Sequence, residues 1–127
     1  MSIDSRQSKM ECVIADNVTL PPNCEIGSFV KIYPNVTFGS NVTIGDFCVI
    51  GQKGPKREGD LDGLHIPDNS VIRSHSVVYA GSTFGSGLTT GHHVVIRERT
   101  VAGKNLRVGN FSDIEGDCEI GDYCRFH

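Results

Sequence analysis

The sequence predicts an all-β fold, a parallel β-solenoid of about six triangular coils, and three observations support this prediction. A large apolar residue recurs at nearly every sixth position from Ile14 to Phe126, and the spacing is interrupted once. Glycine accounts for 15 of the 127 residues, which suits a fold with many tight turns. A spacing of six fits neither the roughly 3.6-residue period of a helix nor the two-residue alternation of a flat strand.

Each position of the six-residue repeat has its own role. Position one, which is Ile14 in the first unit, is Ile, Leu, Val or Phe in sixteen of eighteen units and is predicted to face the core. Position two is Gly in nine units. Position four holds six of the seven asparagines, namely Asn17, Asn23, Asn35, Asn41, Asn69 and Asn105. Because Asn tolerates the left-handed backbone conformation, position four is predicted to be a turn with positive φ.

Three repeats form the three sides of one coil, so eighteen units predict six coils stacked at the strand spacing. Residues 1–13 are expected to form a lead-in, and residues 14–127 the solenoid. Sixteen residues separate Ile50 from Ile66, ten more than one unit, so about residues 56–65 are predicted to leave the prism as a loop. We expect this loop to act as a flap that reaches a neighbouring subunit and is mobile or ordered only by that neighbour.

The five cysteines follow the same register. Four of them occupy position five, where small inward residues are expected, and the fifth does so if the register is extended back by one unit: Cys24, Cys48, Cys118, Cys124 and Cys12. Their number is odd and no CxxC pair occurs. We therefore expect reduced thiols that pack in the core, without disulfides and without a metal.

Composition argues against several classes of partner. The net charge is −3 and the basic residues are dispersed, so we expect no nucleic-acid partner. No apolar run approaches the roughly 20 residues that span a bilayer, so we expect no membrane partner. The start of the chain, MSIDSRQSKM, lacks the apolar segment of a signal peptide, which predicts a cytoplasmic protein.

Residues eighteen apart, corrected for the loop, are predicted to stack in columns along the three corners. One corner has rings at position four, in the order Phe29, Phe47, His75, His93 and Phe111. Position three of the same corner places His92 between Ser74 and Asn110. Next to this corner, Val49, Val77 and Val95 are predicted to face outward as an apolar strip. A neighbouring subunit is expected to cover that strip.

The repeat, and the motif TGHHVVIRE at residues 90–98, resemble the hexapeptide-repeat acyltransferases, and most of all the sugar-nucleotide acetyltransferases. The resemblance implies a left-handed parallel β-helix, a homotrimer, acetyl-CoA as acyl donor, and an amino or hydroxyl group of a sugar nucleotide as acceptor. His92 matches the family's catalytic histidine. His93 replaces the acidic residue that follows it, and it is a second candidate catalytic residue that could orient His92. The resemblance implies no metal. Gly109 and Asn110, one coil further on, are candidates for contacting the donor.

Two alternatives remain open at this stage. A γ-type zinc carbonic anhydrase has the same fold but needs three converging histidines, with a close pair separated by four residues. Here the closest pair, His92 and His93, is contiguous. A non-catalytic scaffold is the other alternative, because a fold alone does not confer an activity. Bound zinc would favour the first alternative, and thioester turnover would favour the acetyltransferase.

Overall fold

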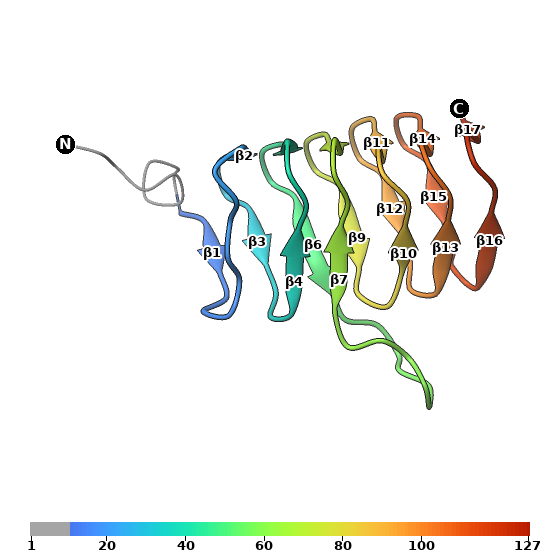
Figure 1. Cartoon of the computed structure of the whole chain (residues 1–127), viewed down its shortest axis with the longest axis horizontal. Coiled ribbons are helices and arrows are strands. Elements are labelled where there is room, and N and C mark those ends of the chain that lie inside the picture. The colour runs from blue at the N-terminus through green and yellow to red at the C-terminus, as the bar shows by residue number, and fades with distance from the viewer. Residues whose placement is uncertain (1–10) are drawn as a thin grey trace.

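The structure, a computed structural model that describes residues 11–127, is a three-walled prism of short strands (Figure 1). Every strand pair is parallel, and residues 11–127 contain no helix, so none that could cross a membrane. Most of the predicted lead-in, residues 1–13, lies outside the described residues. Its last residue, Val13, already belongs to β1. The predicted all-β solenoid is confirmed.

Three walls make up the prism. The first wall consists of β1 (Val13–Ile14), β3 (Lys31–Ile32), β6 (Val49–Gln52), β9 (Val77–Tyr79), β12 (Val95–Ile96) and β15 (Asp113–Ile114). The second wall consists of β2 (Cys24–Ile26), β5 (Val42–Ile44), β8 (Val71–Ile72), β11 (Thr89–Thr90), β14 (Arg107–Val108) and β17 (Arg125–Phe126). The third wall consists of β4 (Val36–Phe38) and β7 (Leu64–Ile66), followed by β10 (Thr83–Phe84), β13 (Thr100–Ala102) and β16 (Cys118–Ile120).

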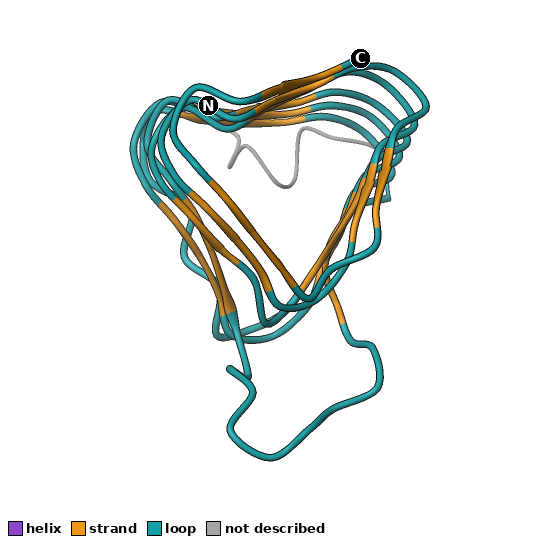
Figure 2. Ribbon diagram, turned by 90° about the vertical axis from the view of Figure 1, so that its right-hand side faces the viewer, coloured by secondary structure: helices purple, strands orange, loops and turns teal. Residues whose placement is uncertain are grey.

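The coil is left-handed. Figure 2 looks along the prism from the end at which β17 lies. In Figure 1 the third wall is the wall nearest the viewer, so it lies on the left in Figure 2. In Figure 2 the chain crosses the second wall at the top, descends the first wall on the right and climbs the third wall on the left. It thus turns clockwise while it advances toward the viewer, which defines a left-handed helix.

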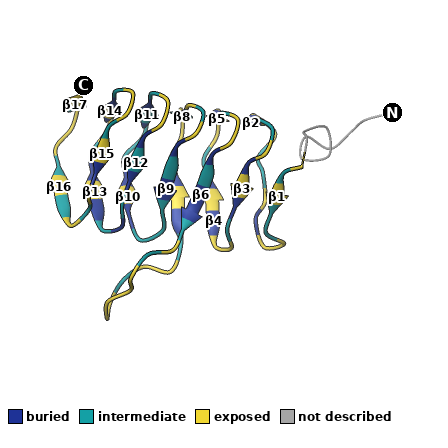
Figure 3. Cartoon of the chain, turned by 180° about the vertical axis from the view of Figure 1, so that it is seen from behind, coloured by how far each residue is buried: buried dark blue, intermediate teal, exposed yellow. Residues whose placement is uncertain are grey.

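The eighteen-residue register places positions one and five in the core. Ile14 pairs with Ile32, and Cys24 pairs with Val42, each eighteen residues apart. Strands such as Val42–Ile44 alternate buried, exposed, buried, and this alternation recurs along the prism (Figure 3). Seven of the twelve largest fully buried side chains are position-one isoleucines, namely Ile26, Ile32, Ile44, Ile50, Ile66, Ile72 and Ile96.

Positive φ recurs at position four along the whole prism, and the exceptions among residues 14–127 are Asn17, Asn23 and Lys53. The non-glycine examples include Asn35, Asn41, Asn69 and Asn105, with φ between 59° and 66°. Asn17 and Asn23 were predicted to share this conformation, and that prediction is wrong, because neither has positive φ. Pro21 and Pro22 lie between them, and a proline has no N–H for a ladder hydrogen bond. No strand forms between β1 and β2, so the turn geometry there is different.

The loop leaves the prism two residues earlier than predicted. Val36 pairs with Leu64, which is 28 residues later, so the ten residues in excess of a coil are 54–63 rather than 56–65. His65 is not a loop residue, because it lies in β7 and pairs with Thr37. Just before the loop, β6 contains a register irregularity at Gly51, whose φ is 89°.

All five cysteines are free thiols, as the register predicted. Cys24 and Cys48 are buried, and Cys12, Cys118 and Cys124 are partly buried against the core. Burial raises the pKa of the Cys24 thiol to about 11, and it also raises the pKa of Cys48. Thiols that stay protonated at neutral pH are poor nucleophiles, which suits a packing role.

Candidate active site

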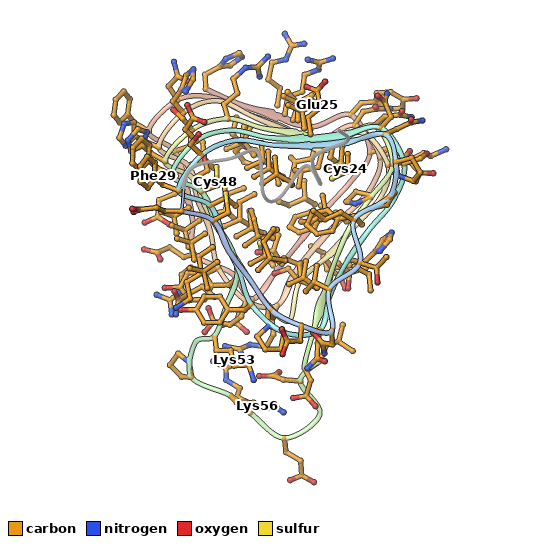
Figure 4. The ribbon with its side chains drawn as sticks, turned by 90° about the vertical axis from the view of Figure 1, so that its left-hand side faces the viewer. Cys24, Glu25, Phe29, Cys48, Lys53 and Lys56 are labelled. Carbon is orange, nitrogen blue, oxygen red and sulfur yellow. The ribbon has the colours of Figure 1, made fainter. Side chains whose placement is uncertain are left out.

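The ring corner, where the second wall turns into the first, carries the predicted column of five rings. Successive centroids from Phe29 to Phe111 are 5.1, 4.9, 4.6 and 5.0 Å apart, and neighbouring planes lie within 22° of parallel. All five residues have φ between 56° and 62°. Figure 4 shows Phe29 pointing outward from this corner, whereas Cys24 and Cys48 point into the prism.

Stacking compensates for an unfavourable backbone conformation. The left-handed region costs an L-residue other than Gly or Asn about 1–2 kcal/mol. The corner between the third and second walls meets the same requirement with Asn41, Asn69 and Asn105. At the ring corner each ring instead stacks on the ring of the next coil, which contributes about 0.5–1.5 kcal/mol per pair beyond area burial. Stacking between coils thus offsets the backbone cost that Asn avoids at the other corner.

His92 lies on this corner, one residue before the column. Its Nδ1 is 2.7 Å from Oγ of Ser74 on the preceding coil. Its backbone N–H donates to Oδ1 of Asn110 on the following coil, at 2.7 Å. The imidazole is exposed, and within residues 11–127 its Nε2 makes no hydrogen bond. The site therefore presents Nε2 of His92 to solvent, while its Nδ1 is hydrogen-bonded to Ser74.

Ser74 links two histidines. Its Oγ lies 2.7 Å from Nδ1 of His92 and 3.1 Å from Nδ1 of His75. A hydroxyl has one proton to donate, so Ser74 can donate to one ring and accept from the other. When it donates to His75, His92 donates its Nδ1–H to Ser74 and keeps a lone pair on Nε2. That tautomer is the one a general base requires. The shared column placed Ser74 beside His92, but the register did not predict a hydrogen bond between the two side chains.

His93 belongs to the ring column. Its ring stacks on His75 at 4.6 Å and on Phe111 at 5.0 Å. In the described part of the chain, no hydrogen bond joins its ring to His92. The group in contact with Nδ1 of His92 is therefore Ser74 and not His93.

Gly109 and Asn110, the residues predicted to contact the donor, lie one coil beyond His92. The N–H of Gly109 donates to the carbonyl of Phe126 at 2.6 Å, so it is not available to a ligand. The Oδ1 of Asn110 is occupied by the N–H of His92. Carboxylates make the same contact to the preceding coil at three other places, in the pairs Asp46 with Ser28, Asp68 with Ser40, and Asp122 with Lys104. The carbonyl of Asn110 thus connects coils, and its side-chain NH₂ is the group left for a ligand.

The apolar strip predicted beside this corner is present. Val49, Val77 and Val95 are aligned across β6, β9 and β12 at outward positions of the first wall, and each remains partly exposed. The ring corner therefore separates an apolar strip on the first wall from the outer surface of the second wall.

The opposite edge of the first wall carries the loop, and ion pairs hold the loop to its own prism. Nη1 of Arg57 lies 2.9 Å from Asp117, and Nη1 of Arg99 lies 2.7 Å from Asp60. Nε of Arg99 also donates to Asp117 at 2.6 Å. We call these four residues the loop clamp. These ion pairs join the loop to its own prism, whereas its mobility and its reach toward a neighbouring subunit stay predictions.

Glu98 lies under the loop and away from the ring corner. It is buried, with its carboxylate 2.9 Å from Nε of Arg97 and 3.9 Å from Nη2 of Arg99. The hydrogen bond from Arg97 lowers the pKa of Glu98 and keeps it ionised. Lys56 and Gly54 line the same small cavity of about 100 Å³. Glu98 therefore belongs to the attachment of the loop.

The histidines do not converge in the manner of a zinc site. Residues 11–127 contain no group of three or more His, Cys, Asp or Glu side chains placed to hold a metal ion. His75 and His93 stack face to face, which directs their nitrogens along the rims of the rings and not toward a common point. His65 is on the third wall, where its Nδ1 lies 2.7 Å from Oγ1 of Thr37.

Comparison with known proteins bears on the repeat. No curated protein matches the chain. Residues 23–53 match the family model described as Bacterial transferase hexapeptide (six repeats). The matched stretch runs from β2 to the start of the loop and precedes His92 along the chain. Over these early coils the prism is therefore similar to the hexapeptide-repeat transferases.

Proposed function

We propose that the protein is an acyltransferase that moves an acetyl group from acetyl-CoA to an amino or hydroxyl group of a sugar nucleotide, with His92 as general base. One observation carries the proposal: the imidazole of His92 is exposed, and Ser74 holds its Nδ1 while its Nε2 stays open. The repeat shared with bacterial hexapeptide transferases supports the reaction class.

The chemistry requires one proton to move twice. Nε2 of His92 takes the proton of the acceptor N–H or O–H as that atom attacks the carbonyl carbon of the thioester. The tetrahedral intermediate then collapses, the C–S bond breaks, and the imidazolium returns the proton to the leaving thiolate. Ser74 keeps the ring oriented, and the ring column, with His93 in it, keeps the corner rigid. Bringing donor and acceptor together supplies much of the remaining rate enhancement.

The test measures release of the CoA thiol from acetyl-CoA in the presence of a panel of amino-sugar nucleotides. His92→Ala should lower turnover by about 10²- to 10⁴-fold, the usual contribution of a positioned base. His65→Ala is the matched control, because His65 is also exposed but binds Thr37 on another wall. Unchanged turnover in His92→Ala, or an equal loss in both variants, would reject His92 as the base.

We further propose a homotrimer in which the strip of Val49, Val77 and Val95 packs against a neighbouring prism. A monomer would leave these three valines in contact with water. Sedimentation equilibrium at micromolar protein should give three times the 13.8 kDa of one chain. Val77→Glu should shift that mass toward the monomer, while Thr43→Glu, on the second wall, should not. A monomeric wild-type protein would contradict this proposal.

A further inference from the structure

A groove of about 410 Å³ on the second wall borders the ring corner and is lined by three arginines, Arg73, Arg107 and Arg125. Arg107 and Arg125 are direct neighbours on β14 and β17, at the outward position of each strand. Arg73 follows β8, and its Nη1 donates to the carbonyl of Thr90 at 3.1 Å, so its side chain lies along the wall. We call this feature the arginine groove.

The three arginines lack acidic partners within the part of the chain that the structure describes. Three others, Arg57, Arg97 and Arg99, each bind a carboxylate. The carboxylate at an outward position of the second wall is Glu25, which points away from the prism in Figure 4. Its strand, β2, is four strand steps from β14, about 19 Å at the usual spacing and well beyond the Debye length, so Glu25 does not neutralise Arg107 or Arg125.

This arrangement is unfavourable without a counter-charge. Like charges directly opposite on neighbouring strands destabilise a sheet, and Arg107 and Arg125 are such a pair. Guanidinium groups offer paired N–H donors whose geometry matches a phosphate. The groove is therefore suited to a phosphorylated ligand that neutralises all three.

The floor of the groove is bare, which lets a ligand approach closely. Gly91 and Gly109 succeed Arg73 at position two of the following coils, and both line the groove. A Cβ at Gly91 would come within 2.2 Å of Oδ1 of Asn110, so a side chain is excluded there. The N–H groups of both glycines are bonded to carbonyls of the next coil. The guanidinium groups, and not the backbone, are thus the donors for an anion.

We propose that the arginine groove binds the diphosphate of a nucleotide-linked substrate and so directs its reactive end to His92. The inference rests on the proposed function, because His92 directly follows Gly91 and Asn110 directly follows Gly109. Both substrates of the proposed reaction, acetyl-CoA and the sugar nucleotide, contain a diphosphate. The groove has the chemistry that either would use.

The experiment is calorimetric titration of the full chain with inorganic pyrophosphate, UDP and CoA, at low and moderate salt. We expect binding that weakens with salt, and a double variant Arg107→Gln/Arg125→Gln that binds about 10- to 100-fold more weakly. Lys31→Gln/Lys104→Gln is the matched control, since it removes the same charge from exposed positions outside the groove. If the double variant binds UDP more weakly but CoA as tightly as the wild type, the groove belongs to the acceptor. If it binds CoA more weakly but UDP as tightly, the groove belongs to the donor.

Two outcomes separate this inference from the proposed function. Binding that depends on the groove in a protein without thioester turnover would retain the groove and reject the acyltransferase. Turnover with an unchanged KM for both substrates in the arginine variant would retain the acyltransferase and reject the groove. No binding of any of the three probes to the wild-type protein, or equal weakening in the lysine control, would also overturn the inference.

Discussion

The ring corner and the loop clamp occupy two edges of the same wall and use the same backbone turn for different purposes. His93 and Arg99 both lie at position four, with φ of 56° and 60°. At the ring corner the side chains stack on one another and leave the imidazole of His92 open. At the clamp the side chains neutralise one another across 60 residues of sequence, as Arg57 and Asp117 do. The solenoid backbone defines the turn and leaves its side chains free to carry either chemistry or structure.

Among the tests of this comparison, the largest loss of function is expected when Ser74 is replaced. Ser74→Ala should lower kcat about tenfold, because a hydrogen bond to the ring of His92 is lost. Ser74→Thr, which keeps the hydroxyl, should recover most of the activity.

Ser28→Ala is the control for the ring corner, because Ser28 has the same column position but no histidine beside it on the next coil. Equal activity losses in Ser74→Ala and Ser28→Ala would show that Ser74 serves the turn alone.

A smaller effect is expected at the loop clamp. Asp117→Asn should speed tryptic cleavage after Lys56 or Arg57 by about three- to tenfold, because exposed ion pairs are individually weak. Asp113→Asn, which removes an exposed carboxylate from the first wall, should leave the cleavage rate unchanged. If both variants are cleaved at the wild-type rate, the clamp does not hold the loop.

Acid should open the clamp in the same way. The hydrogen bond from Arg99 lowers the pKa of Asp117, and the N–H of Arg57 lowers that of Asp60. Carboxylates with lowered pKa stabilise the folded arrangement above the ordinary carboxyl pKa, and this contribution is lost as pH falls through the lowered values. The NMR signal of the Arg99 Nε–H should therefore move in that acid range and stay constant near neutrality.

The smallest effect is expected from replacing a ring by a turn former. Phe111→Asn should change the free energy of unfolding by less than about 1 kcal/mol, because Asn relieves the backbone cost that the lost stacking had offset. Phe111 is 77% exposed, so little core area is lost. Chemical denaturation measures the change. A loss of several kcal/mol would mean that the ring column is a structural spine.

The sequence predicted the columns well because every coil repeats the same spacing. Counting by eighteen predicted the stack from Phe29 to Phe111 and the inward cysteines. It also predicted that His92 lies between Ser74 and Asn110. The loop boundary was two residues wrong, because Gly54 and Pro55 look like a continuing coil whereas Leu64 and His65 look like loop. The proline-containing first coil was likewise misjudged at Asn17 and Asn23.

Contacts made by side chains that leave the repeat could not be predicted. The pairing of Arg57 with Asp117 depends on the path of a loop that has no periodicity. The bond between Ser74 and His92 depends on rotamers, which the register does not determine. The arginine groove could have been predicted from the sequence, because Arg107 and Arg125 are eighteen residues apart at the same outward position.

Because every coil has the same height, the prism sets fixed distances along its axis. Groups along one corner can occur only at multiples of about 4.8 Å, because each coil adds one strand spacing. An imidazole moved from residue 92 to the equivalent position 74 or 110 would shift by one coil, about 4.8 Å, without altering the wall around it. A ligand anchored on one coil therefore meets chemistry at a distance set by a whole number of coils, and sequence change can adjust that number one step at a time.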